Sequence, residues 1–150
     1  INLKLILYGK QIALSFVDAI NTHDIDKIYS LMADDHLFVD AYASEVHGRE
    51  EMKRSWIGYF EWFPDYKIEV TDVFVDEEKV AIFGIASGTY RGEMTDDGRN
   101  RYKLPAAWKV VVGNNKVKLW QVICDSKIPF DIMNEIDKNI VDKLYTDTQK

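Results

Sequence analysis

The spacing of apolar residues divides the chain into a helical first part and a strand-rich second part. Over residues 5–22 the apolar side chains recur at helical spacing and predict an amphipathic helix. Asp24 suits the N-cap of a second, short helix, and residues 36–40 predict a short strand. A third helix is predicted from Gly48 to just before Pro64, because proline cannot donate the next helical hydrogen bond.

Beyond Pro64 the apolar pattern changes to a period of two, which is typical of strands. Turns rich in Asp, Gly and Asn separate the alternating segments. These segments are residues 66–75, 80–90, 102–112 and 117–124. They predict an antiparallel meander, and Pro129 then opens a last helix. The pattern therefore predicts one α+β domain over residues 1–150, with helices first and a curved antiparallel sheet second.

Composition narrows the class of partner. Aromatic residues make up 13% of the chain, which favours a core that contains a pocket for a flat apolar molecule. The net charge of -6 argues against a nucleic-acid groove, which needs clustered Lys and Arg. No apolar run reaches the roughly 20 residues of a membrane span.

Cys124 is the only cysteine, which excludes an intrachain disulfide and fits a reducing, cytoplasmic location. The chain begins at Ile1 rather than Met, so a signal segment removed from the N-terminus stays an open alternative. His23, His36 and His47 lack the spacing of metal ligands, so we expect no metal and no cofactor. His36 is expected at the surface or against a loop.

Five short motifs occur in a recognisable order. They are residues 16–26 (FVDAINTHDID), 31–35 (LMADD), 46–50 (VHGRE), 63–66 (FPDY) and 88–93 (GTYRGE). The first three resemble motifs of the nuclear transport factor 2-like superfamily, and the last two resemble its SnoaL-like polyketide cyclase branch. The resemblance covers about residues 10–125. It implies a cone-shaped, cystatin-like α+β fold, with residues 129–146 as an extra C-terminal helix over the dimer edge or the mouth of the cone.

The resemblance implies a role for Asp40. In the ketosteroid isomerase branch a general-base aspartate ends the first strand, and Asp40 takes that position. A carboxylate that faces an apolar cavity becomes a better base, because the cavity disfavours its charged form. Such a base removes a proton α to a carbonyl. The alternative is an aspartate that ends a strand and accepts hydrogen bonds from the backbone of the following loop.

The donors of the isomerase branch are missing. That branch stabilises the enolate oxygen with a tyrosine on the first helix and a protonated aspartate on a late strand. The matching positions hold Phe16 and Ala107, which cannot donate, so the resemblance argues against ketosteroid isomerase activity. In the SnoaL-like motif Tyr90 replaces a histidine and is our candidate hydrogen-bond donor. By the same alignment Trp120 faces the cavity, and Asp125 either turns away from it or lies at its rim.

Two functions stay open. The first is cyclase- or isomerase-type proton transfer by Asp40 on a small apolar molecule. The second is a non-catalytic module that binds a small ligand or forms a homodimer through the outer face of the sheet, which carries apolar residues. The aromatic residues expected to line the pocket are Phe16, Phe38, Trp56, Tyr59, Phe60, Trp108 and Trp120.

Overall fold

The computed structural model describes residues 3–92 and 95–148, with side chains up to residue 138 apart from residue 5. The helices are α1 (Leu3–Asn21), α2 (Ile25–Leu31), α3 (Arg49–Trp62) and α4 (Lys127–Thr148). The strands are β1 (Met32–Val39), β2 (Glu45–His47), β3 (Lys67–Asp76), β4 (Lys79–Thr89), β5 (Arg101–Gly113) and β6 (Lys116–Cys124). Within the described residues, no helix is long and apolar enough to cross a membrane.

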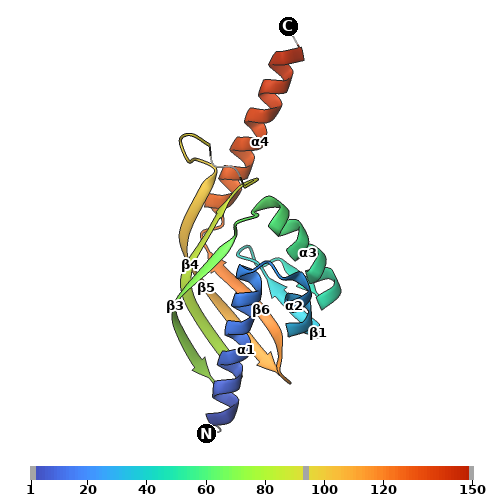
Figure 1. Cartoon of the computed structure of the whole chain (residues 1–150), viewed down its shortest axis with the longest axis vertical. Helices are drawn as coiled ribbons and strands as arrows, with labels where there is room; N and C mark the ends of the chain where they lie inside the picture. The colour runs from blue at the N-terminus through green and yellow to red at the C-terminus, as the bar shows by residue number, and fades with distance from the viewer. Residues whose placement is uncertain (1–2, 93–94, 149–150) are drawn as a thin grey trace.

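A six-stranded sheet in the order β2-β1-β6-β5-β4-β3 forms the body of the molecule (Figure 1). The predicted antiparallel meander is confirmed for β3 to β6. The first strand differs from the prediction: β1 starts at Met32 rather than at residue 36, and it pairs with β6 in parallel. The sequence pattern missed β2, because a strand of three residues is too short to show alternation.

The helices pack on the inner face of the curved sheet, and the predicted α+β class is confirmed. Helix α1 contacts β3 to β6, and α3 contacts β1 and β2. Phe16 of α1 is fully buried, and its ring lies 4.9 Å from that of Trp120 on β6. This aromatic contact fixes the first helix against the middle of the sheet.

The motif that ends α1 joins this helix to β3. The side-chain amide of Asn21 donates to the carbonyl oxygen of Ile68 at 2.8 Å and accepts from the backbone N–H of Ile68 at 2.8 Å. Asp24 caps α2, as predicted, by accepting from the backbone N–H of Lys27 at 3.0 Å. These contacts explain the motif as part of the fold rather than of the chemistry.

His36 corrects a sequence expectation. Its side chain is fully buried, not at the surface. The ring Nδ1–H donates to the carbonyl oxygen of Val117 on β6 at 2.7 Å, and burial lowers the pKa of the imidazole. His36 therefore fastens β1 to β6 as a neutral side chain.

The last helix begins against the body and then leaves it. Figure 1 shows α4 starting beside the ends of β4 and β5 and then projecting away from the sheet. The helix begins at Lys127, two residues before the predicted start at Pro129. A proline in the first turn costs no hydrogen bond, because the N–H groups there have no partner within the helix.

Candidate functional site

A cavity of about 410 Å³ lies between α3, the inner face of the sheet and the start of α4. Most of its lining is aromatic or aliphatic. Of the residues predicted to line a pocket, five line this cavity: Phe38, Trp56, Tyr59, Trp108 and Trp120. The helical period predicted the inward orientation of Trp56 and Tyr59, and the resemblance predicted that of Trp120.

Phe16 and Phe60 were predicted to line the pocket but do not. Phe16 lies behind the wall, with its ring 6.4 Å from that of Trp56. Phe60 turns toward the end of α1, where its ring stacks on that of His23 at 4.0 Å. Periodicity identified the buried face of each helix, but it does not separate residues at the cavity from residues packed beneath them.

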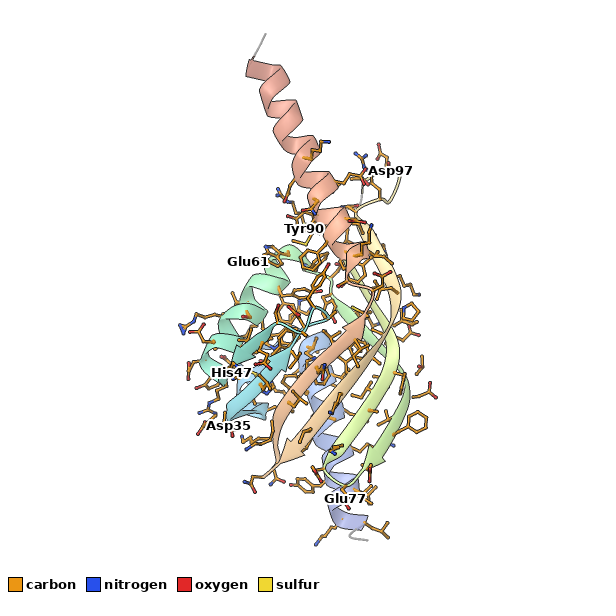
Figure 2. The ribbon with its side chains drawn as sticks, turned by 180° about the vertical axis from the view of Figure 1, so that it is seen from behind. Asp35, His47, Glu61, Glu77, Tyr90 and Asp97 are labelled. Carbon is orange, nitrogen blue, oxygen red and sulfur yellow. The ribbon has the colours of Figure 1, made fainter. Side chains whose placement is uncertain are left out.

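Tyr90 is also outside the cavity, which corrects its role as candidate donor. Its hydroxyl lies 3.2 Å from each carboxylate oxygen of Asp137 on α4 and donates to that carboxylate. Figure 2 shows Tyr90 at the base of α4. The sequence motif could not reveal this, because the resemblance does not cover α4.

Three tyrosines line the cavity side by side, and two of them are joined through their hydroxyls. The hydroxyl oxygens of Tyr59 on α3 and Tyr102 on β5 are 3.1 Å apart and share a hydrogen bond. The ring of Tyr66 meets that of Tyr59 edge to face at 5.0 Å. Burial raises the pKa of Tyr59 to about 12 and holds those of Tyr66 and Tyr102 well above their usual range. All three are therefore neutral at physiological pH.

The sequence analysis missed Tyr66 and Tyr102. A signal for Tyr102 was present, since it shares the strand phase of Trp108 on β5. Both point inward, whereas Ala107 lies on the outer face opposite Phe83 of β4. The position aligned with the donor aspartate of the isomerase branch thus does not reach the cavity, and Tyr102 is the hydrogen-bonding group that β5 supplies.

The tyrosine pair leaves hydrogen-bonding capacity unused. A hydroxyl donates one hydrogen bond, so one of the two hydrogens of the Tyr59–Tyr102 pair is used within the pair and the other is free. The indole N–H of Trp56 is buried without a partner in the described part of the chain. Burial also raises the pKa of the Cys124 thiol, which lines the same cavity. The interior is therefore uncharged and offers donors.

Asp40 lines the cavity and also shapes the turn after β1. Its Oδ1 accepts from the backbone N–H groups of Tyr42 at 2.8 Å and Ser44 at 2.9 Å. Its other oxygen, Oδ2, makes no hydrogen bond to any described residue. The hydrogen bonds of Oδ1 hold the loop, as one of the two alternatives predicted, while Oδ2 has no partner among the described residues.

No cluster of three or more His, Cys, Asp or Glu side chains suited to a metal ion occurs among the residues described. Asp40 is the sole carboxylate in the described lining, which also holds no Lys, Arg or His side chain. The site can therefore orient an uncharged molecule through hydroxyl donors, and its lining contains one carboxylate.

The fold is shared with solved structures. A putative SnoaL-like polyketide cyclase from Shewanella putrefaciens CN-32 is 16% identical with a TM-score of 0.71, over 85% of this chain and 96% of that one. An epoxide hydrolase of M. tuberculosis, described as LEH-like, is 13% identical with a TM-score of 0.71, over 90% and 96%. A ketosteroid isomerase-like fold from Catenulispora acidiphila DSM 44928, in complex with trimethylamine, is 18% identical with a TM-score of 0.65, over 74% and 82%.

These identities show a common fold and not a common reaction. No curated protein matches the chain in sequence. The SnoaL-like domain family matches residues 13–120, which run from the second half of α1 through β5 to the first half of β6. This chain belongs to the SnoaL-like domain family.

Proposed function

We propose that the cavity binds a flat, largely apolar small molecule and that the Tyr59–Tyr102 pair donates a hydrogen bond to a carbonyl or similar oxygen of that molecule. The observation that carries the proposal is a pair of neutral, buried hydroxyls in a cavity walled by aromatic side chains. A buried donor without an acceptor costs free energy, and a ligand oxygen removes this cost.

Size and charge support the same class of ligand. A volume of about 410 Å³ lies within the range of small-molecule sites. No basic side chain occurs in the described lining, so an anionic ligand would lose its hydration without gaining a partner. Trp56, Trp108 and Trp120 give flat surfaces for an aromatic ring system.

The binding proposal is tested with prodan, a neutral naphthalene dye whose ethyl ketone accepts hydrogen bonds. Wild-type protein is expected to bind prodan with a blue shift of its emission. The double variant Tyr59→Phe/Tyr102→Phe is expected to bind roughly two- to tenfold more weakly, because it loses the donated hydrogen bond and keeps the rings. Fluorescence titration measures both affinities.

Tyr29→Phe is the matched control, because the Tyr29 hydroxyl bonds to Glu50 at the surface and does not line the cavity. Its affinity for prodan is expected to equal that of the wild type. Equal affinity of the double variant would remove the tyrosine pair from the proposed site.

A second function, proton transfer by Asp40, is favoured by its unused oxygen at the cavity. In this reaction Oδ2 removes a proton from the carbon next to the ketone, and the resulting enolate oxygen accepts a hydrogen bond from a tyrosine. The same carboxyl then returns a proton to the carbon. In D2O the proton held by the carboxyl is replaced by deuterium from the solvent before the return step, so deuterium uptake reports proton removal without a net reaction.

We expect the protein to speed deuterium uptake at the methylene group of the prodan ketone. Asp40→Asn is expected to slow this uptake by about 100-fold or more, since general-base catalysis contributes on that scale. The asparagine side-chain oxygen can still accept from Tyr42 and Ser44, so the turn is retained. Mass spectrometry follows the exchange, and equal rates for the two proteins would leave binding as the function.

Exposed apolar residues on the outer face of the sheet support the proposal that the protein forms a homodimer through this face. Phe74, Phe83 and Ile123 are exposed there, at 62%, 46% and 56%. On the same face, β3 carries the acidic residues Glu69, Asp72 and Asp76. The basic residues Lys103 and Lys109 lie on β5. Two copies related by a two-fold axis place the acidic strand of each over the basic strand of the other.

Phe83→Lys is expected to convert the dimer to a monomer, because it places a charge in the centre of this apolar face. Light scattering coupled to gel filtration measures the mass. Ile57→Lys is the control, since Ile57 has a similar exposure of 42% on α3, outside this face. A wild type that is monomeric at high concentration would contradict the dimer.

A further inference from the structure

The start of α4 forms one side of the cavity. Pro129, Phe130 and Met133 all line it, together with Ser126 just before the helix. These residues lie beyond the part of the chain that matches the family. Most of the other lining residues lie within the part of the chain that matches the family. Helix α4 is therefore the wall of the cavity that the family pattern does not describe.

Apolar packing against the core, the hydrogen bond from Tyr90 to Asp137 and exposed side-chain contacts hold α4 in this position. The guanidinium of Arg91 donates to the carboxylate of Asp137 at 2.6 Å, and that of Arg99 donates to Glu135 at 3.3 Å. The ring of Phe130 meets that of Tyr42 at 5.3 Å. The four charged side chains of the two ion pairs are each about half exposed. Exposed ion pairs of this kind each contribute little to the free energy that holds the helix in place.

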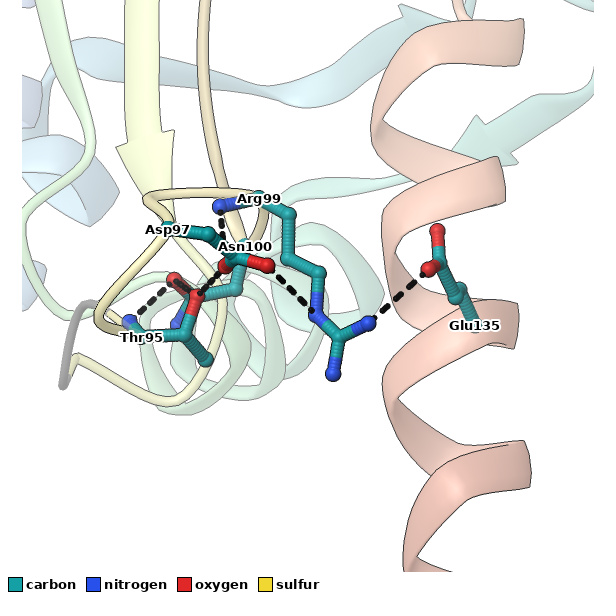
Figure 3. A network of polar contacts seen from close by, with 5 residues as sticks. All are labelled: Thr95, Asp97, Arg99, Asn100 and Glu135. Carbon is teal, nitrogen blue, oxygen red and sulfur yellow. Dashed lines mark hydrogen bonds and ion pairs between the residues drawn. The ribbon is translucent and has the colours of Figure 1, made fainter.

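The loop between β4 and β5 is braced so that Arg99 reaches α4 (Figure 3). Asn100 is buried and accepts from the backbone N–H of Thr95 at 2.8 Å. The Thr95 hydroxyl donates to Asp97 at 2.7 Å, and Asp97 lies 3.6 Å from the Arg99 guanidinium. The loop is thus internally bonded, whereas its attachment to the helix depends on exposed pairs.

We infer that α4 is the movable wall of the ligand site, and that Met133 limits the size of the ligand while the Arg91–Asp137 and Arg99–Glu135 pairs set the rate of its release. The inference rests on the proposed binding function. Besides the packing of its first turns and the hydrogen bond from Tyr90 to Asp137, the helix is held by half-exposed ion pairs and has few contacts with the sheet, so we expect it to open more readily than the strands. Ligand exchange then requires α4 to separate from the loop.

The release rate is tested by stopped-flow dissociation of prodan. Arg91→Glu is expected to raise the dissociation rate constant about tenfold, because the variant replaces an attraction with a repulsion of Asp137. The swapped variant Arg91→Glu/Asp137→Arg is expected to return the rate to within about twofold of the wild type, since it restores an ion pair.

Arg54→Glu is the matched control, with the same change of charge at an exposed ion pair on α3 that does not touch α4. Its dissociation rate is expected to equal that of the wild type. If prodan binds the wild type but leaves the Arg91→Glu variant no faster, α4 is a fixed wall and this inference fails, while the binding function stands. A wild type that does not bind prodan overturns both.

The size limit is tested at Met133. Met133→Trp is expected to weaken prodan binding about tenfold or more, because the larger side chain fills space at the cavity. Asn134→Trp makes a comparable change at the next, exposed position and is expected to leave the affinity unchanged. Equal affinities for these two variants would overturn the role of Met133.

Discussion

Gly84→Ala is expected to lower the free energy of unfolding by about 3 kcal/mol or more, because the added methyl group overpacks a site walled by backbone. A Cβ at this position would lie 2.0 Å from the carbonyl oxygen of Glu69 and 3.2 Å from the Cα of Val70. Both atoms belong to the backbone of β3, which cannot move aside as a side chain can. Urea denaturation at a fixed temperature measures the change.

The close approach arises from a bulge in β3. Val70 pairs with Gly84 and Asp72 with Phe83, so Thr71 is an extra residue on one strand. The bulge bends β3 toward β4 and leaves room only for a residue without a side chain. Relief of the clash therefore requires the bulge to be lost or the strands to separate.

Gly58→Ala is the control for this prediction. A Cβ on Gly58 would have no neighbour within 4 Å, and the residue lies within α3. Alanine is a better helix former than glycine, so this variant is expected to be more stable by up to about 1 kcal/mol. If both variants unfold at the wild-type urea concentration, the close packing at Gly84 is contradicted.

The second large effect is a loss of stability in mild acid, caused by His36. Burial lowers the pKa of His36 in the folded protein, whereas the unfolded chain binds the proton near the usual value of 6.5. Above pH 6.5 both states are neutral, and stability does not depend on this group. Below it the unfolded state binds more protons, so the free energy of unfolding falls by about 1.4 kcal/mol per pH unit until the folded pKa is reached.

Urea denaturation at pH values between 7.5 and 5 measures this slope. His36→Gln is expected to be less stable at pH 7.5 but to show a much flatter dependence, because glutamine can donate to Val117 and does not titrate. His47→Gln, at an exposed site, is expected to keep the wild-type slope. A His36→Gln variant with the full wild-type slope would show that other groups cause the acid sensitivity.

Carboxylates affect the free energy of unfolding in a lower range of pH than His36 does. The Lys118 ammonium lowers the pKa of Asp35, and the hydrogen bond from Thr95 lowers that of Asp97. Groups with a lowered carboxyl pKa stabilise the fold above the unfolded value of 3.8 and lose this contribution only as the pH falls through the folded pKa. The range between pH 5 and 6.5 therefore isolates the histidine effect.

The fold was largely predictable because its signals are local. The change of period after Pro64 and the N-cap at Asp24 each depend on neighbours in the chain, and both predictions agree with the structure. The burial of His36 was not predictable in this way. It depends on the parallel pairing of β1 with β6, in which His36 bonds to Val117 across 81 residues of sequence.

The site was predictable only in part, for a related reason. Alternation along a strand indicates which residues share a face, but it left the phase of residues 105–111 ambiguous, and Trp120 was placed by the resemblance; both Trp108 and Trp120 line the cavity. Alternation does not state which inward residues meet across the cavity, as Tyr59 and Tyr102 do. Tyr90 was misplaced because its partner Asp137 belongs to a helix outside the family pattern.

The parallel pair of β1 and β6 has a consequence for biosynthesis. β1 is made early, but its main partner in the sheet is one of the last strands to leave the ribosome. Until then β1 pairs only with the short β2, and the apolar face of α1 has no complete sheet to cover it. We therefore expect the N-terminal half of the nascent chain to expose apolar surface, and to be prone to aggregation, until the last strand completes the sheet.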